Sequence, residues 1–215
     1  MLTSAVRVGW GWGNRAVAAL ALLLLSPVIL AVAVWVRIAD GPGILFVQDR
    51  AGRGGVPFRM WKFRSMVHNA VGMSTQLGIS DPFGLVEDDP RITRCGRFLR
   101  RTSLDELPQL VNVLRGQMNL VGPRPDVLPQ VARYSPDDAR RLEVKPGITG
   151  WAQINGRDAI DWPERFELDR WYVDHWSPAL DLKILWRTFT TLHRNEVPVR
   201  VDTLNIQRAQ DVSRA

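Results

Sequence analysis

Apolar positions in this chain form one long run and several shorter periodic stretches. Residues 16–36 contain no charged side chain, and a helix needs about 20 such residues to cross a bilayer. Ser26-Pro27 interrupts the run near its middle. Proline removes a backbone donor and clashes with the carbonyl four residues earlier, so a kink is predicted there, and Ser26 can bind a freed carbonyl. A cleaved signal peptide would have a shorter apolar core.

Two interpretations of this segment remain open. One is a kinked transmembrane anchor, and the other is a re-entrant helix that returns to the side from which it entered. Basic residues flank the run at both ends, namely Arg7 and Arg15 before it and Arg37, Arg50 and Arg53 after it. Because positive charge marks the cytoplasmic side, this distribution favours both ends on one side.

Beyond the run the pattern becomes strand-like. Residues 44–47 predict a short buried strand and residues 58–66 alternate like a second one, with a glycine-rich loop between them. The prediction is a β-hairpin. Alternation places Met60, Lys62 and Arg64 on one face of the second strand. Such a basic face can meet phosphate, although exposed basic side chains are more often simply solvated.

Leucine and valine recur at helical spacing from Leu104 onward and predict a helix buried on one side. Pro108 would clash with the carbonyl of Leu104, so the start of this helix is predicted to be distorted. Ser103 and Glu106 have the spacing of a capping box. Asp105 then either favours the helix dipole or acts as a nucleophile toward a phosphoryl group, which a helix N-terminus attracts.

Three further stretches bear on function. Pro123 and Pro125 fix the backbone on both sides of Arg124, which suits bidentate phosphate recognition, and a stiff surface turn is the alternative. Residues 146–157 carry glycines that permit close approach to a ligand or form a turn between strands. Residues 180–189 predict an amphipathic helix that fits core packing or a membrane surface.

Composition narrows the classes of function. The chain has 215 residues, a net charge of +6, nine Trp and one Cys, so it is long enough for a packed core but has no internal disulfide framework. A basic surface suits nucleic acid, anionic lipid or a phosphorylated substrate, and charge alone does not choose among them. The sequence contains no P-loop, no HExxH zinc motif and no GxSxG nucleophile motif.

Six motifs occur in order: Ser-Pro within the apolar run, then WKFRSM, RRTSLDELPQL, LVGPRP, KPGITGWAQINGR and FELDRWYV. Over residues 14–192 the chain resembles the bacterial sugar transferases, that is, the monotopic phosphoglycosyl transferases. The resemblance implies an α/β fold for a monotopic membrane protein with an N-terminal re-entrant membrane helix broken at Ser26-Pro27, a small β-hairpin or sheet, and amphipathic surface helices. We expect a membrane segment at 1–37, a catalytic domain at 38–192 and a polar tail at 193–215.

The resemblance implies transfer of a phosphosugar from a UDP-sugar to polyprenyl (undecaprenyl) phosphate. UMP is released, and the reaction passes through a covalent phosphosugar-aspartate intermediate with Mg²⁺ as cofactor. This would be the first membrane step in the synthesis of a surface polysaccharide or glycoconjugate. The expected place is the bacterial inner (cytoplasmic) membrane, with the catalytic domain on the cytoplasmic face. Besides the two substrates, the expected partner is a bilayer with anionic lipid and not nucleic acid. The sugar, the pathway and the oligomeric state, including a homo-oligomer, stay open.

Residue roles follow from motif position within that resemblance. Asp105 would be the nucleophile, Glu106 would ligate Mg²⁺, and Arg124 would hold a phosphate. The remaining substrate-site residues would be Lys62, Arg64, Asp169 and Arg157.

The chain departs from the family pattern at two places. Residues 10–14 read Trp-Gly-Trp-Gly-Asn, where members often have Lys-Arg-x-Phe-Asp. Gln117 replaces the usual acidic residue before the next motif. A non-catalytic scaffold that binds anionic lipid through basic patches is the alternative from another class of protein.

Overall fold

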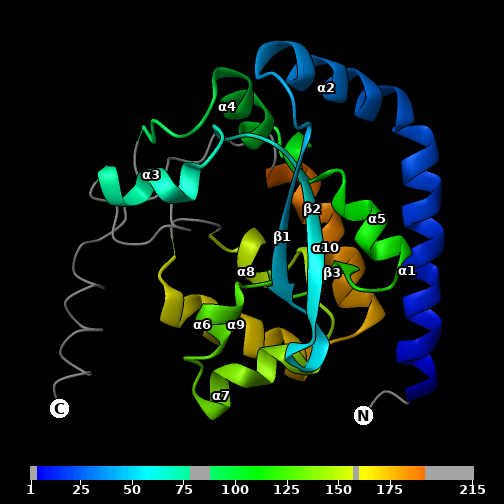
Figure 1. The fold of residues 1–215 in the computed structure, drawn as a ribbon. Coiled ribbons are helices and arrows are strands. Elements are labelled where there is room, and N and C mark those ends of the chain that lie inside the picture. The colour runs from blue at the N-terminus through cyan, green and yellow to red at the C-terminus, as the bar shows by residue number, and fades with distance from the viewer. Residues whose placement is uncertain (1–3, 78–87, 157–159, 192–215) are drawn as a thin grey trace, which may run out of the picture.

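The computed structural model describes residues 4–77, 88–156 and 160–191 (Figure 1). The strands are β1 (Leu45–Ala51), β2 (Pro57–Phe63), β3 (Asn119–Val121) and β4 (Gly147–Thr149). The α-helices are α1 (Ser4–Leu24), α2 (Ser26–Ala39), α3 (Ala70–Gln76), α4 (Arg94–Arg101), α5 (Gln109–Leu114), α6 (Leu128–Val131), α7 (Pro136–Ala139), α8 (Trp151–Ile154), α9 (Trp162–His175) and α10 (Pro178–Thr191). Three short 3-10 helices are η1 (Arg53–Gly55), η2 (Leu104–Glu106) and η3 (Arg140–Glu143).

The mixed helix and sheet architecture agrees with the predicted α/β class. In Figure 1 the hairpin of β1 and β2 crosses the middle of the molecule, α1 runs along one side, and α2 crosses the top. Helix α10 lies behind the hairpin. The catalytic candidates come from β2, η2 and the loop after β3, and helices α1, α2 and α10 surround this part of the molecule.

The apolar run folds as two helices that meet at Ser26-Pro27. Pro27 has no N–H to offer the Leu23 carbonyl, and the hydroxyl of Ser26 donates to that carbonyl at 2.8 Å. The predicted kink and the predicted use of Ser26 are both confirmed. Among the described helices none alone has the length and apolarity to cross a bilayer, but Gly9–Leu24 and Ser26–Ala39 have them together and are bent by 63°.

The inner sides of α1 and α2 belong to the hydrophobic core. Ala18 of α1 packs in a cluster with Phe58 and Met60 of β2. Val32 and Val36 of α2 pack in a second cluster, with Phe63, Cys95 and Leu99. The outer sides expose large apolar side chains, including Leu20, Leu23, Leu24, Leu30 and Ile38. One helix pair thus covers the domain and presents apolar surface away from it.

The predicted hairpin is confirmed. Its strands pair antiparallel, from Leu45 opposite Phe63 to Ala51 opposite Pro57. The connection contains Gly54 and Gly55 at φ 67° and 76°. Glycine adopts this left-handed conformation without strain, which accounts for the glycines between the strands.

The glycine-rich stretch 146–157 contributes to a second sheet, in which β4 pairs with β3 in parallel. The carboxyl ends of both strands lie at the same edge, where Gly122 and Gly150 follow them. A Cβ on Gly150 would lie 2.2 Å from the carbonyl oxygen of Gly122. The glycine therefore permits two segments of this chain to approach each other.

The distorted helix start near Pro108 is confirmed, whereas the capping box is wrong. The amide of Leu107 donates to the carbonyl of Leu104 at 3.3 Å, in a 3-10 turn, and α5 begins only after Pro108. Ser103 has a left-handed φ of 56° and its side chain makes no capping hydrogen bond. A capping residue is normally extended, so this backbone cannot aim the hydroxyl at the helix start.

The chain between 126 and 144 is divided into α6, α7 and η3, and α3 lies between the hairpin and α4. Asp89, just before α4, is buried and forms an ion pair with Arg91 at 2.6 Å. Arg157 and the predicted tail 193–215 lie outside the described residues.

Candidate active site

Glu106 is the point at which three segments of the chain meet. Its Oε1 accepts a hydrogen bond from Nζ of Lys62 at 2.9 Å and lies 3.0 Å from Nη2 of Arg124. Lys62 comes from β2, Glu106 from η2, and Arg124 from the loop after β3. The fold therefore brings together three residues that the sequence placed far apart.

The carboxylate of Asp105 lies beside this group but is not bonded to it. The residue is 6% exposed. Its negative charge acts to raise the pKa of Lys62 and of Arg100. Within residues 4–77, 88–156 and 160–191, no hydrogen bond or ion pair joins the Asp105 side chain to another residue. Asp105 is therefore a shielded carboxylate whose oxygens are not committed to a neighbour.

The local fold explains why the side chains of Asp105 and Glu106 point away from the hydrophobic clusters. Leu104 and Leu107 pack into the hydrophobic clusters on either side of η2. A 3-10 turn has three residues per turn, so positions 104 and 107 share one side and the residues between them point elsewhere. Asp105 and Glu106 are those residues. The left-handed Ser103 supplies the sharp turn between α4 and η2.

The pKa values of the two neighbouring acids move in opposite directions. Burial raises the pKa of Asp105, with Lys62 opposing that shift and Glu106 reinforcing it. Burial also acts to raise the pKa of Glu106, but Arg124 and Lys62 outweigh it and lower that pKa to about 2. Glu106 is thus held as an anion by its partners. Lys62 and Arg124 act to lower the pKa of Asp105 as well, but there burial has the larger effect.

Lys62 has a lowered pKa, first because it is buried and next because Arg124 lies near it, while Glu106 opposes the shift. The site holds Lys62 and Arg124 against Asp105 and Glu106, so the four formal charges sum to zero. A phosphate or diphosphate entering such a site meets two cations. Its own negative charge would compete with Glu106 for them.

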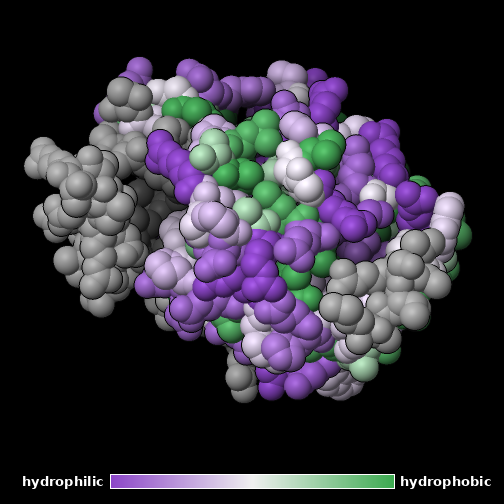
Figure 2. Space-filling model, turned by 90° about the horizontal axis from the view of Figure 1, so that it is seen from below, coloured by the Kyte–Doolittle hydropathy of each residue, from purple (hydrophilic) through white to green (hydrophobic). Residues whose placement is uncertain are grey.

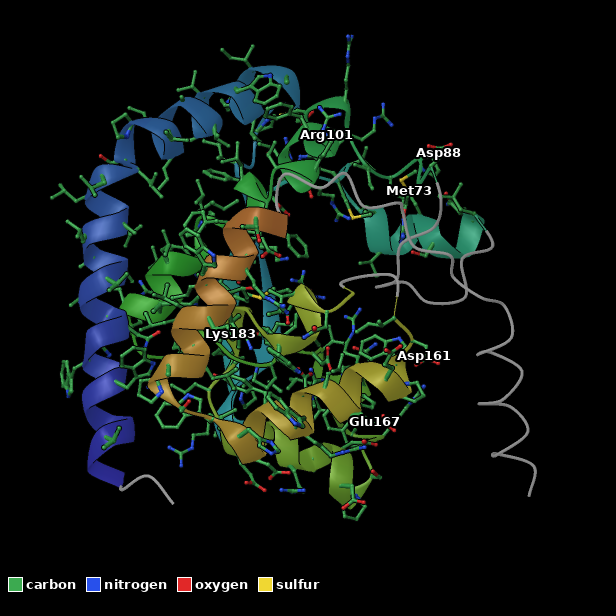
Figure 3. The ribbon with its side chains drawn as sticks, turned by 180° about the vertical axis from the view of Figure 1, so that it is seen from behind. Met73, Asp88, Arg101, Asp161, Glu167 and Lys183 are labelled. Atoms are coloured by element: carbon green, nitrogen blue, oxygen red, sulfur yellow. The ribbon has the colours of Figure 1, made fainter. Side chains whose placement is uncertain are left out.

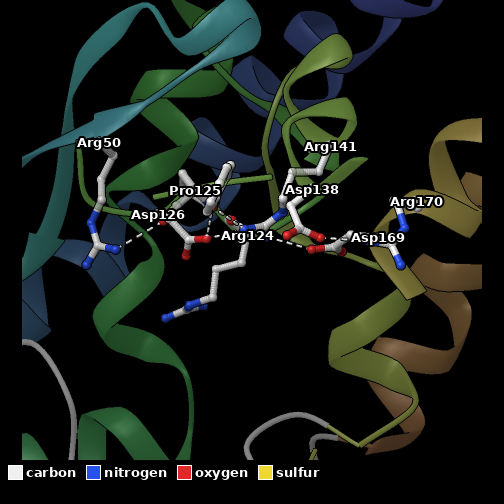
Figure 4. A network of polar contacts seen from close by, with 9 residues as sticks. Arg50, Arg124, Pro125, Asp126, Asp138, Arg141, Asp169 and Arg170 are labelled. Atoms are coloured by element: carbon white, nitrogen blue, oxygen red, sulfur yellow. Dashed lines mark hydrogen bonds and ion pairs between the residues drawn. The ribbon is translucent and has the colours of Figure 1, made fainter. Parts of the chain in front are cut away.

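Asp169 and Arg124 are linked through a buried arginine that the sequence did not single out. Arg141 Nη2 donates to Asp169 Oδ2 at 2.5 Å and to the main-chain oxygen of Arg124 at 3.0 Å. Figure 4 shows Arg141 between Asp169 and the loop that carries Arg124. Burial raises the pKa of Asp169 although Arg141 acts to lower it. Asp169 therefore contacts the site through Arg141.

The structure does not bring Arg64 into contact with the two acids. Its guanidinium donates to the main-chain oxygens of Asp40 at 2.5 Å and Gly41 at 3.1 Å, and it also contacts Pro42 and His68. Arg64 thus holds the turn that follows α2. Strand alternation predicts Arg64 on the same face as Lys62. Because β2 ends at Phe63, Arg64 lies outside the strand and the alternation no longer applies to it.

Similarity to known proteins decides the family. The sequence model described as "Bacterial sugar transferase" matches residues 12–195. An uncharacterized sugar transferase EpsL of Bacillus subtilis is 49% identical over 163 residues, which is 76% of each chain. The chain belongs to the bacterial sugar transferase family. The family resemblance predicted from the six motifs is confirmed, and with it the expectation of a transferase.

Two further relatives of this bacterial sugar transferase carry names that state an activity. The undecaprenyl-phosphate galactose phosphotransferase of Salmonella typhimurium is 42% identical over 184 residues, which cover 81% of this chain and 38% of the relative. The UDP-glucose:undecaprenyl-phosphate glucose-1-phosphate transferase of Escherichia coli is 44% identical over 180 residues, covering 80% of this chain and 37% of the relative. The chain thus spans less than two fifths of these two longer proteins.

The two departures of this sugar transferase from the family pattern retain hydrogen-bond acceptors. Asn14 Oδ1 accepts from the amide of Leu120 at 2.8 Å, which ties α1 to β3. Gln117 Oε1 accepts from Nδ2 of Asn112 at 2.8 Å. A carboxylate oxygen can accept the same bonds. Replacement of an acid by an amide therefore removes charge but keeps these two connections.

The acids of the site fit a magnesium ion that relies on substrate phosphates. No group of three or more acidic, histidine or cysteine side chains suited to a metal occurs in the described parts of the chain. Among the residues that the structure describes, both contacts of Glu106 use Oε1, and none binds the Asp105 carboxylate. Mg²⁺ in phosphate-transfer sites is often bound by one or two carboxylates plus phosphate oxygens, which this pair can supply.

Proposed function

We propose that this protein transfers a sugar phosphate from a UDP-sugar to polyprenyl phosphate, with Asp105 as the nucleophile. The observation that carries the proposal is the contrast between the two adjacent acids. Glu106 is bonded to Lys62 and Arg124, while Asp105 is buried with oxygens that no described residue binds. An unbonded carboxylate next to two cations suits attack on a phosphoryl group that those cations attract.

The reaction follows in two displacements at phosphorus. An oxygen of Asp105 attacks the phosphorus that bears the sugar, and the bond from this phosphorus to the bridging oxygen breaks, so that UMP leaves with that bonding pair. An oxygen of polyprenyl phosphate then attacks the same phosphorus, and the acyl phosphate bond to Asp105 breaks. The products are UMP and a polyprenyl-diphosphate sugar, and the Asp105 carboxylate is regenerated.

Lys62 and Arg124 hold the substrate phosphates in this proposal. Their contacts to Glu106 set the positions of both cationic groups before substrate binds, which reduces the reorganisation needed as charge develops. Glu106 Oε2 and the substrate phosphates would hold Mg²⁺. The bound ion would neutralise charge on the diphosphate as the bond to UMP breaks.

The place of the reaction is proposed from the apolar outer surface. Leu182, Trp186 and Phe189 form an exposed stripe on α10, and Trp186 is 73% exposed. Figure 3 shows that α10 begins beside α1. Trp10 Nε1 of α1 donates to Asp181 Oδ2 of α10 at 2.6 Å. Figure 2 shows apolar side chains in a band across the lower face and along the edge where α1 lies. We propose that α1 and α2 enter a bacterial cytoplasmic membrane as a re-entrant pair and that α10 rests on it.

The test is UMP release by detergent-solubilised protein incubated with a panel of UDP-sugars, polyprenyl phosphate and Mg²⁺. Wild type should release UMP with at least one sugar, and Asp105→Asn should reduce the rate on the order of 10⁴-fold. Asp137→Asn is a matched control, because Asp137 is exposed on α7. No UMP with any sugar would favour a lipid-binding scaffold instead, and an active Asp105→Asn would exclude this nucleophile.

A further inference from the structure

The loop Pro123-Arg124-Pro125 has few backbone donors through which the rest of the chain can hold it in place. Its two prolines have no N–H, so Arg124 carries the only backbone donor of the three residues. The loop can therefore be fixed chiefly through its carbonyl oxygens. Those oxygens need donors from other elements.

Each of the three carbonyls receives a donor from a different part of the chain. The oxygen of Pro123 accepts from the amide of Gly147 at 3.0 Å. The oxygen of Arg124 accepts from Arg141 at 3.0 Å, and that of Pro125 accepts from Arg50 Nη1 at 3.1 Å. Strand β4, helix η3 and strand β1 thus hold three consecutive residues. The side chain of the middle residue reaches Glu106.

Arg141 differs from the other two donors because its guanidinium is itself fixed on several sides. Its side chain is 2% exposed. It forms ion pairs with Asp169 at 2.5 Å and with Asp126, and it donates to the hydroxyl of Tyr134 at 2.6 Å. A guanidinium is planar with donors in a rigid fork. Two carboxylates therefore set the plane in which the bond to the Arg124 carbonyl is made (Figure 4).

We propose that Arg141 is a positioning residue that sets the phosphate-binding placement of Arg124, and that Asp169 affects the reaction through Arg141 and not by contact with substrate. The inference rests on the proposed function, because Arg124 binds a phosphate only if the substrate is a phosphorylated one. It assigns Arg141 a role, and it changes the role of Asp169 from a substrate contact to a support for Arg141.

A purely structural role for Arg141 makes a different prediction. Loss of a buried charged group lowers stability in either case, because it leaves Asp126 and Asp169 without their cation. Only the positioning role makes the effect on substrate binding depend on Arg124. If Arg124 is already absent, there is no longer a side chain for Arg141 to place.

The test is a double-mutant cycle between positions 141 and 124. Arg141→Lys keeps the charge but loses the fork, and Arg124→Ala removes the phosphate contact. Affinity for UDP, measured by titration calorimetry on the full chain in nanodiscs, and KM for the UDP-sugar in the UMP assay are the two readouts. Arg140→Lys is the matched control, since Arg140 is an adjacent arginine that is 41% exposed and pairs with Asp174 on the surface.

The proposal predicts that Arg141→Lys weakens UDP binding and raises KM about tenfold or more, as expected for a displaced binding group. In the Arg124→Ala background the same change should have less than a twofold effect. Asp169→Asn should act in the same direction with a smaller magnitude, and it serves as the second variant if Arg141→Lys fails to fold. Arg140→Lys should match wild type.

Equal effects of Arg141→Lys in both backgrounds, or an unchanged UDP affinity in the single variant, would overturn the proposal. Failure of the proposed function is distinguishable from this, because it would appear as absent UMP release by wild type. The calorimetric cycle does not depend on turnover, so it tests Arg141 in that case as well.

Discussion

Asp105 and Glu106 are neighbours in the chain, yet the fold gives their carboxylates different surroundings. Glu106 is fixed by Lys62 and Arg124, which lower its pKa to about 2. Asp105 is buried, and burial raises its pKa. A carboxylate with a raised pKa is a stronger nucleophile than one with a lowered pKa, provided that it is ionised at the working pH. Lys62 acts to lower the pKa of Asp105 and so favours its ionised form, which makes this lysine part of the proposed chemistry.

Replacement of Lys62 should change the pH dependence of the first displacement. Lys62 lowers the pKa of Asp105, so Lys62→Gln should raise that pKa further. Because only ionised Asp105 attacks, the rate rises as pH increases through its pKa, and this acidic limb should move to higher pH in the variant. Single-turnover UMP formation between about pH 4 and about pH 9, a range that lies between the ordinary pKa values of aspartate and lysine, measures the limb.

Arg59→Gln is the matched control for that experiment, because Arg59 lies on the same strand with an exposed side chain. Its profile should superimpose on that of wild type. An acidic limb that stays in place in Lys62→Gln would mean that Lys62 does not govern Asp105.

The candidate site could be predicted from sequence where local motifs carry it. The motifs predict Asp105, Glu106, Lys62 and Arg124, and direct contacts join three of these four residues. No motif predicts Arg141, because in the sequence it is only one arginine in a charged stretch. Its importance arises from Asp126 and Asp169, which the fold brings to it across 15 and 28 residues of sequence. No periodicity reports such pairing.

At the scale of elements, proline controls the two breaks that matter. Pro27 separates α1 from α2, and Pro108 separates η2 from α5. Both breaks were predictable, because the missing N–H and the ring clash act locally. The parallel pairing of β3 with β4 was not, since each strand spans only three residues. Strands that short carry no readable alternation.

Removal of the Pro27 break should change how the N-terminal pair sits in the membrane. Pro27→Ala restores an N–H that can donate to the Leu23 carbonyl, which now accepts from Ser26. A proline in a helix interior costs about 3 kcal/mol, so the variant should favour a straight helix that spans the bilayer. Ala5→Cys in the Pro27→Ala background should become accessible to an impermeant maleimide in intact cells.

In the parent protein, Ala5→Cys and Asn205→Cys should both be labelled only after the cells are permeabilised. The native Cys95 is buried and gives little background. Pro163→Ala is the control, because Pro163 lies in the first turn of α9, where no helical bond is lost. Labelling of the two engineered cysteines from opposite sides in the parent would exclude the re-entrant pair.

At the scale of the whole molecule, apolar surface lies on the outer side of α1 and α2 and on one side of α10. The amphipathic pattern of residues 180–189 left core packing and a membrane surface open. In the structure Ile184 is buried, which confirms core packing for one side of the helix, whereas Leu182, Trp186 and Phe189 are exposed. Which apolar residues remain uncovered depends on the packing of α10 against the rest of the fold, and the sequence of one helix does not contain that information.

The exposed stripe of α10 should contact lipid. A nitroxide attached at Phe189→Cys in reconstituted protein should be more accessible to oxygen than to a polar nickel complex, as expected inside hydrocarbon. A nitroxide at Glu167→Cys should show the reverse, because Glu167 is exposed on α9 (Figure 3). Equal aqueous accessibility at both positions would mean that α10 does not rest on the membrane.

The central claim, that Asp105 carries the sugar phosphate, is tested most directly by intact-protein mass spectrometry. Wild type is incubated with the productive UDP-sugar and Mg²⁺ while polyprenyl phosphate is left out. The account predicts that the intact protein gains the mass of one sugar phosphate, that this gain is lost on addition of polyprenyl phosphate, and that it is absent in Asp105→Asn. Stoichiometric UMP release by wild type without any mass increase would contradict it.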